Sequence, residues 1–169
     1  MSRSSIALAA ATAAALIVGL SAPAQAAPAE RLCRGTITGA TTGSIRVPAG
    51  AACTINNANV RGAINVDARG SLTVNGAVID RSVTAVGYTK VSVTNSRVGG
   101  AISLSTGGAI ALTAVVVAGS VTLTANRQGT KVLKYNAISG KLSCTNNAPA
   151  PTGVANVVSG GKFGQCVRV

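Results

Sequence analysis

A repeat of nineteen residues runs from Ser44 to Gly119 and constrains the fold more than any other feature of the sequence. Its four units cover residues 44–62, 63–81, 82–100 and 101–119. Apolar residues recur at the same places in each unit, and the second position holds Ile45, Ile64, Val83 and Ile102. A unit this short cannot bury an apolar face alone, so successive units must stack to make one continuous core. The sequence therefore predicts a solenoid.

Apolar and polar residues alternate within each unit, as in Ile64 and Val66 or Leu72 and Val74. Alternation with a period of two is typical of strands that turn one face inward. A further apolar position near the end of each unit holds Val60, Ile79, Val98 and Val117, which gives three short strands per coil. We expect an all-β chain that folds as one right-handed parallel β-helix of about six to seven coils.

A left-handed β-helix is the alternative, because solenoids of that kind are built on sub-repeats of about six residues. Val66, Leu72 and Val78 follow this spacing, whereas Asn59 and Arg97 interrupt the same column in other units. The nineteen-residue unit and its unequal strand spacing favour the right-handed form.

Glycine and asparagine recur between the expected strands and mark the corners of each coil. The columns are Gly50, Gly70, Gly107 and Gly108 after the first strand, Asn57, Gly76 and Asn95 after the second, and Gly62, Gly100 and Gly119 at the end of the unit. Both residue types tolerate a left-handed backbone, which tight corners require.

The repeat is less regular at both ends of the chain. Residues 27–43 are expected to form an incomplete first coil, an N-terminal cap in which Leu32 and Ile37 supply the apolar surface. Regular coils cover 44–140, and 141–169 form the last coil and the C-terminal cap. The inward pattern continues as Val121, Leu123, Val132, Ile138 and Leu142. We place the extra residues of these longer units at corners, because an insertion in a strand would turn its inward side chains outward.

Residues 1–26 have the features of a signal peptide. Arg3 supplies the positive charge, 6–20 the apolar segment, and Ala24-Gln25-Ala26 the small-residue cleavage site. A retained membrane anchor is the weaker interpretation, because the apolar run breaks at Ser21 and Pro23. We expect cleavage between Ala26 and Ala27, a secreted product, and no membrane span in the mature form.

Four cysteines in an exported chain are expected to pair, because the compartment is oxidising. We favour Cys33 with Cys53 and Cys144 with Cys166, since each pair lies about one coil apart and is nearly superimposed in a stack. Each disulfide would then stabilise one end of the solenoid, where the terminal coil has a neighbour on one side only.

Histidine is absent, which removes Ser-His-Asp and Cys-His catalysis. Asp67 and Asp80 fall on different sides of one coil, so they cannot form the paired acids of a glycosidase. Asp80 instead shares a column with Arg61, which predicts a surface ion pair. We expect no enzyme activity, no catalytic residue, no cofactor and no metal site.

The C-terminal stretch LSCTNNAPAPTGVANVVSGGKFGQC, residues 142–166, resembles the closing segment of small secreted actinobacterial proteins of unknown function. The resemblance implies a signal peptide, a short right-handed β-helix and a Cys-terminated cap, and it implies no catalytic residues. The chain also resembles the pectate-lyase-like superfold in outline, whose enzymes would carry a calcium site of clustered acidic residues. Calcium takes about six to eight oxygen ligands, which two scattered aspartates do not supply.

The formal net charge is +12, from fifteen Lys and Arg against three Asp and Glu, and such a charge favours anionic partners. We predict a protein that binds anionic polysaccharide, cell-wall polyanions or extracellular nucleic acid. The candidate anion-binding residues are Arg46, Arg61, Arg69, Arg81, Lys90, Arg97, Lys131 and Lys134. Aromatic residues make up 2% of the chain, so recognition would be electrostatic and sensitive to salt.

Three alternatives stay open. The basic side chains could serve only to solubilise a structural surface or coat protein. An outward ladder that includes Thr54, Thr73 and Thr113 resembles ice-binding solenoids, although a solvent-facing strand rich in threonine explains it as well. A degenerate polysaccharide lyase or hydrolase is supported by analogy of fold alone.

Overall fold

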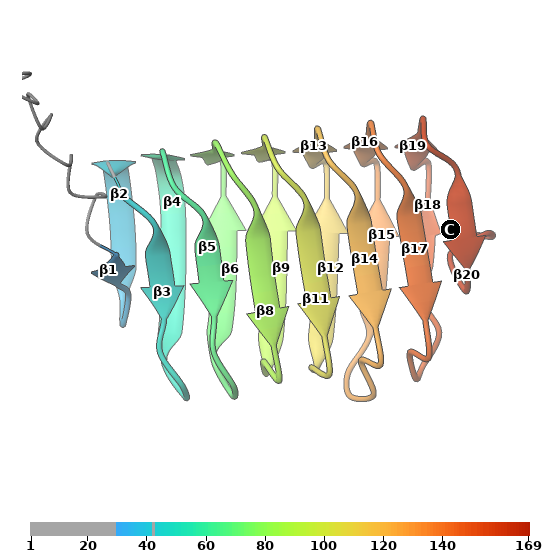
Figure 1. Cartoon of the computed structure of the whole chain (residues 1–169), viewed down its shortest axis with the longest axis horizontal. Coiled ribbons are helices and arrows are strands. Elements are labelled where there is room, and N and C mark those ends of the chain that lie inside the picture. Colours follow the sequence, from blue (N-terminus) through green and yellow to red (C-terminus); the bar gives the residue numbers. More distant parts are fainter. Residues whose placement is uncertain (1–29, 42) are drawn as a thin grey trace, which may run out of the picture.

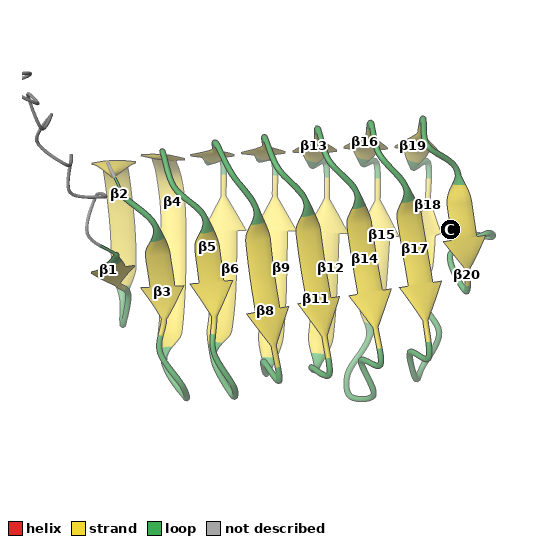
Figure 2. Cartoon of the chain, in the orientation of Figure 1, coloured by secondary structure: helices red, strands yellow, loops and turns green. Residues whose placement is uncertain are grey.

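The structure is a computed structural model that describes residues 30–41 and 43–169. The predicted signal peptide, 1–26, lies outside the described residues. Figure 1 shows a rod of parallel strands stacked in coils, and Figure 2 shows strands and loops without helices in the described part. We number coils 1 to 4 as the four repeat units, coil 5 as 120–140 and coil 6 as 141–160.

Three stacks of parallel strands form the faces of the rod. The first stack consists of β1 (Arg31–Leu32), β3 (Ile45–Val47), β5 (Ile64–Val66), β8 (Val83–Val86), β11 (Ile102–Ser105), β14 (Val121–Thr124), β17 (Leu142–Thr145) and β20 (Lys162–Gly164). Eight strands stacked in this order make seven turns, which confirms the expected size.

The second and third stacks share two strands, β2 and β4. The second consists of β2 (Thr36–Thr41), β4 (Ala52–Val60), β6 (Ser71–Asn75), β9 (Lys90–Thr94), β12 (Ala109–Thr113), β15 (Lys131–Lys134) and β18 (Thr152–Val154). The third begins on the last residues of β2 and of β4 and continues through β7 (Val78–Ile79), β10 (Arg97–Val98), β13 (Val116–Val117), β16 (Ala137–Ile138) and β19 (Val157–Val158).

The path of the chain is right-handed. In Figure 1 the strands of the first stack run downward at the front, and those of the second stack run upward behind them. The coils meanwhile advance from left to right, so the chain turns clockwise as it moves away along the rod. The expected right-handed parallel β-helix is therefore observed, and the left-handed alternative is not.

The core consists of the predicted inward columns. Ile45, Ile64, Val83, Ile102, Val121 and Leu142 are fully buried in the first stack. In the second stack Leu72 pairs in register with Val91, and Val91 with Ile110. Since residues one repeat apart are direct neighbours, each column becomes a continuous apolar ladder, which is the arrangement that the repeat predicts.

Two predictions about apolar residues were wrong. Leu32, expected in the N-terminal cap core, is 60% exposed, whereas Ile37 is buried as expected. Val132, expected to point inward, lies on the outer side of β15, where Lys131 and Leu133 pair with Ile110 and Leu112. The two extra residues of coil 5 precede β15. The inward column that contains Ile110 therefore continues at Lys131, so a lysine occupies an apolar position.

Lys131 is therefore buried, and it cannot serve as one of the predicted surface anion-binding residues. Its Nζ donates hydrogen bonds to the carbonyl oxygens of Gln128, Gly129 and Ala148 at 3.1, 2.9 and 2.8 Å. Desolvation lowers the pKa of its ammonium group. The three carbonyl bonds use all three donors of that group, so Lys131 ties the corner of coil 5 to that of coil 6.

The corners after the second stack are built as predicted, with Asn57, Gly76 and Asn95 at φ values of 46°, 61° and 48°. At the other corners Gly50 also has a left-handed backbone, with a φ of 70°, whereas other glycines serve a different purpose. Gly107 has no left-handed backbone, but a Cβ there would collide with the ring of Tyr88. A Cβ at Gly100 would likewise meet Ser82, which begins the same repeat unit and lies one turn of the solenoid below. Close stacking of coils thus requires these glycines.

Both predicted disulfides are present, Cys33 with Cys53 and Cys144 with Cys166, near opposite ends of the rod. The predicted ion pair of Arg61 and Asp80 does not form among the described residues. Arg46 instead pairs with Asp67, with 2.8 Å between Nε and Oδ2, and approaches Glu30 at 3.9 Å. Arg46 and Asp67 belong to neighbouring columns of the first stack, and their side chains meet. Arg61 and Asp80, in contrast, occupy the same column in successive coils.

Candidate functional site

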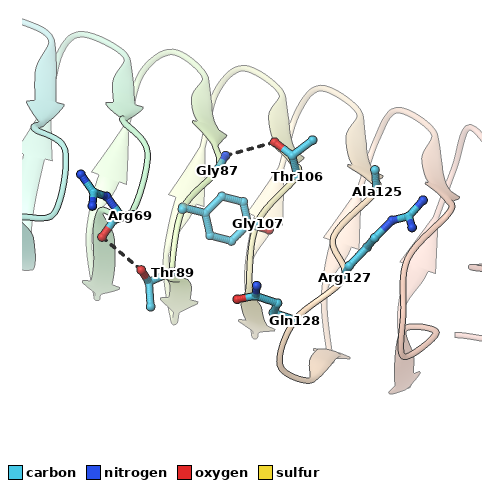
Figure 3. A pocket seen from close by; sticks show the side chains of 9 residues that line it. Arg69, Gly87, Thr89, Thr106, Gly107, Ala125, Arg127 and Gln128 are labelled. Atoms are coloured by element: carbon cyan, nitrogen blue, oxygen red, sulfur yellow. Dashed lines mark hydrogen bonds between the residues drawn. The ribbon is translucent and has the colours of Figure 1, made fainter.

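A cleft of about 520 Å³ opens at the corner between the first and second stacks. Its lining comes from four consecutive coils, with Arg69 in coil 2, Thr89 in coil 3, Thr106 in coil 4, and Arg127 and Gln128 in coil 5. Figure 3 shows Arg69 at one end and Arg127 at the other, with Gly87, Thr106 and Gly107 between them.

The cleft exists because the corners between these stacks project to different extents. Coils 3 and 4 turn with three residues each, 87–89 and 106–108. Coil 2 has no extra residues, since Val66 pairs with Ala85 and Ser71 with Lys90, but its corner forms a turn closed by a hydrogen bond of 3.0 Å from the amide of Gly70 to the carbonyl oxygen of Asp67. Coil 5 turns with six residues, 125–130. The corners of coils 3 and 4 form a saddle between these two projecting corners, as the bottom edge of the rod in Figure 1 shows.

Both arginines lie on the projecting corners and are exposed. Arg69 has a left-handed backbone with a φ of 61°, which is uncommon for a residue with a Cβ. Within the described residues, neither guanidinium group forms an ion pair or a side-chain hydrogen bond. Asp67 is the carboxylate nearest in sequence to Arg69, and it is already paired with Arg46. Both cations are therefore free to meet an anion from solution.

Hydrogen bonds between coils hold the saddle in place. The amide of Gly87 donates to Oγ1 of Thr106 at 3.2 Å, and Oγ1 of Thr89 donates to the carbonyl oxygen of Arg69 at 3.1 Å (Figure 3). The hydroxyls of Thr89 and Thr106 and the amide of Gln128 thus give the cleft a neutral polar lining between its two charges.

Tyr88 supports the saddle from below. Its side chain is buried, and its Oη donates a hydrogen bond of 2.8 Å to Oδ1 of Asn126. The same oxygen accepts from the amide of Gly107 at 2.9 Å. Desolvation raises the pKa of the phenol, so Tyr88 stays neutral and donates at physiological pH.

An amide ladder continues this network toward the C-terminus. Asn126 Nδ2 donates to Asn147 Oδ1 at 2.9 Å, and Asn147 Nδ2 donates to Gln165 Oε1 at 3.1 Å. The sequence carries the signal for this ladder, because Tyr88, Gly107, Asn126 and Asn147 all occupy the seventh position of their units. A column of buried amides fixes the corners of coils 5 and 6, including the wall that carries Arg127.

The predicted anion-binding residues do not lie together in the structure. Arg69 lines the cleft, and Lys90 is the exposed first residue of β9, directly after Thr89. Arg46 is occupied by Asp67, and Lys131 is buried. The others are exposed outside the cleft, Arg61 and Arg81 after strands of the third stack, Arg97 in β10 and Lys134 in β15.

Arg127 and Gln128 were missed by sequence reasoning. They lie in the lengthened corner of coil 5, directly after Asn126, where the insertion falls outside the repeated columns. The length of that unit was the available signal, because extra residues at a corner must project from the regular surface.

Residues 30–41 and 43–169 contain no group of three His, Cys, Asp or Glu side chains that could hold a metal ion. In the same residues no helix is long and apolar enough to cross a membrane. The arrangement at the cleft offers two cations and neutral hydrogen-bonding groups, which suits binding of an anion.

Comparison with protein-family models, with curated proteins and with solved structures finds no match for this chain.

Proposed function

We propose that this chain is a secreted, non-enzymatic protein that binds anionic extracellular or cell-wall polymers, and that the cleft between Arg69 and Arg127 is its binding site. One observation carries the proposal: within residues 30–41 and 43–169, two arginines without an ion-pair partner stand at opposite ends of a cleft that no carboxylate lines. Arginine forks bind carboxylate and phosphate groups through paired, charge-assisted hydrogen bonds.

The charge of the whole chain supports the same function. A net charge of +12 attracts polyanions over long range. Glu30 and Asp67 lie beside Arg46, so they compete little with a ligand for the other cations. Secretion fits two disulfides near the ends of the rod, because disulfides persist in oxidising compartments. Within this proposal the chain is of the same kind as the small secreted actinobacterial proteins that it resembles.

The test measures the affinity of the mature chain for alginate, which carries carboxylates, and for teichoic acid, which carries phosphates. We expect binding that weakens steeply from about 0.05 M to about 0.5 M salt, because released counterions drive it. The double variant Arg69→Gln, Arg127→Gln is expected to lose about tenfold in affinity at low salt, which corresponds to about 1.4 kcal/mol.

The matched control is Arg61→Gln, Arg81→Gln, which removes the same charge from exposed positions outside the cleft. We expect a loss of less than about threefold for it, since distant surface charges are largely screened. Equal losses in the two variants would show that charge acts diffusely and that the cleft is not the site. Absence of binding to both polymers would refute the function itself.

A further inference from the structure

We infer that the occupant of the cleft is a single chain of acidic polysaccharide that crosses the corner of the rod, perpendicular to its long axis, with Arg69 on one side and Arg127 on the other. This inference rests on the proposed function and adds the class of polymer and its direction.

The direction follows from the two projecting corners, those of coils 2 and 5. Along the axis the saddle is closed by residues 67–70 in coil 2 and by 125–130 in coil 5. Across the corner it is open, because coils 3 and 4 turn with three residues and pass directly from β8 to β9 and from β11 to β12. A polymer that lies on the floor therefore enters over the first stack and leaves over the second.

The width of the saddle selects a single chain. Coils 2 and 5 are three steps apart, so their backbones are separated by about 14 Å at about 4.8 Å per step. Side chains of both walls narrow this space further. A DNA duplex, whose two grooves alone are about 12 Å and about 6 Å wide, is too broad to reach the floor between the walls.

The lining favours sugar over unpaired bases. Proteins that bind single-stranded nucleic acid usually stack bases on exposed aromatic rings. Tyr88 is the aromatic residue at the cleft, and its side chain is 2% exposed and hydrogen-bonded to Asn126. Thr89, Thr106 and Gln128 instead present groups that exchange hydrogen bonds with sugar hydroxyls, while the arginines can each hold a carboxylate.

Lys90 offers a third contact to a polysaccharide chain that crosses the cleft. It follows Thr89 on the floor and is exposed on the outer side of β9, between Ser71 and Ala109 of the neighbouring strands. A chain that leaves the cleft over the second stack passes this lysine. The opposite exit passes Val86 and Ser105, which carry no charge, and the neighbouring Asp67 is paired with Arg46. The third contact is therefore reached only by a chain long enough to extend beyond the saddle.

The experiment measures affinity for alginate oligomers of increasing length with the mature chain. We expect affinity to rise and then level off while the oligomers are still shorter than the rod, whose seven coil steps span about 34 Å. Lys90→Gln is expected to leave the affinity for the shortest binding oligomers unchanged and to lower that for longer ones about threefold. Lys134→Gln, an exposed lysine of the same stack beyond the cleft, is the control and is expected to have no effect at any length.

The remaining outcomes separate this inference from the proposed function. If alginate affinity depends on Arg69 and Arg127 but keeps rising until the oligomer is as long as the rod, the crossing direction is wrong and the function stands. If teichoic acid or single-stranded DNA binds through these arginines and alginate does not, the polysaccharide assignment is wrong. If the affinity for duplex DNA depends on the two arginines as strongly as the affinity for alginate does, the cleft does not select a single chain. If no polyanion binds, both proposals fail.

Discussion

Tyr88 donates a hydrogen bond of 2.8 Å from its Oη to Oδ1 of Asn126, which lies two coils further along the solenoid. The ring crosses the intervening coil at Gly107, whose missing side chain leaves the room for it. One buried contact thus joins three consecutive coils directly beneath the floor of the candidate cleft. The packing of this corner determines both the stability of the rod and the shape of the site.

Gly107→Ala is expected to destabilise the protein by about 1–3 kcal/mol, because the new Cβ would overlap the Tyr88 ring and overpacking costs that much. Denaturant unfolding measures the change. Gly35→Ala is the control, since a Cβ there meets nothing within 4 Å. The double variant Gly107→Ala, Tyr88→Leu is expected to regain part of the loss. An unaffected Gly107→Ala would mean that the ring does not lie against this backbone.

Tyr88 also makes stability depend on pH in the alkaline range. Burial raises the pKa of its phenol in the folded state, whereas the unfolded chain ionises near about 10. The folded state therefore keeps a proton that the unfolded state loses, and the contribution, complete below about pH 10, decreases as pH rises above it. Denaturant unfolding of wild type and Tyr88→Phe at several pH values measures this.

We expect wild type to lose stability more steeply than Tyr88→Phe above about pH 10. Near neutral pH the variant is expected to be less stable by about 1 kcal/mol, the usual net contribution of one hydrogen bond. Parallel pH curves for the two proteins would contradict the buried position of the phenol.

The regular part of this fold was predictable because the same pattern of apolar and corner residues recurs in every unit of the repeat. The buried columns of Ile45 and Leu72, the left-handed corner at Asn57 and both disulfides follow from spacing alone. The cleft was harder to predict, since it depends on how far neighbouring corners project and not only on the number of residues in them. Arg69 was recognised only as a cation, and Arg127 lies in an insertion that no column describes.

Lys131 shows why one residue of coil 5, Val132, was wrongly predicted to point inward. Hydrophobicity alone selects Val132 over its neighbour, but strand register is set by hydrogen bonding to Ile110 and Leu112 in the previous coil. The long side chain satisfies this register because its ammonium group reaches three carbonyl oxygens at the corner. The alternation of apolar and polar residues within a single unit cannot show that hydrogen bonds compensate for a buried ammonium group.

Asn147→Leu is expected to destabilise the protein by about 3 kcal/mol. The substitution removes the oxygen that accepts from the backbone amide and from Nδ2 of Asn126, and it removes the donor to the carbonyl of Leu123. Each buried group left without a partner costs about 1–3 kcal/mol. Asn59→Leu, at an exposed position of β4, is expected to change stability by less than about 0.5 kcal/mol in the same denaturant experiment. Similar effects of both substitutions would show that the amide ladder contributes nothing specific.

Lys131→Met tests whether the buried lysine holds the wall of the cleft. Methionine fits the apolar column next to Ile110, but it leaves the carbonyl oxygens of Gln128, Gly129 and Ala148 without their donor. We expect a loss of about 2 kcal/mol in stability, within the range for hydrogen bonds to a charged group, and faster amide hydrogen exchange confined to residues 125–130. Alginate affinity is expected to fall about threefold, since Arg127 sits on this corner. Lys134→Met removes the same charge from the outer end of the same strand, and it is expected to leave both the exchange and the affinity unchanged. If the two variants weaken binding equally, the wall is held by other contacts, and only the charge of the two lysines matters.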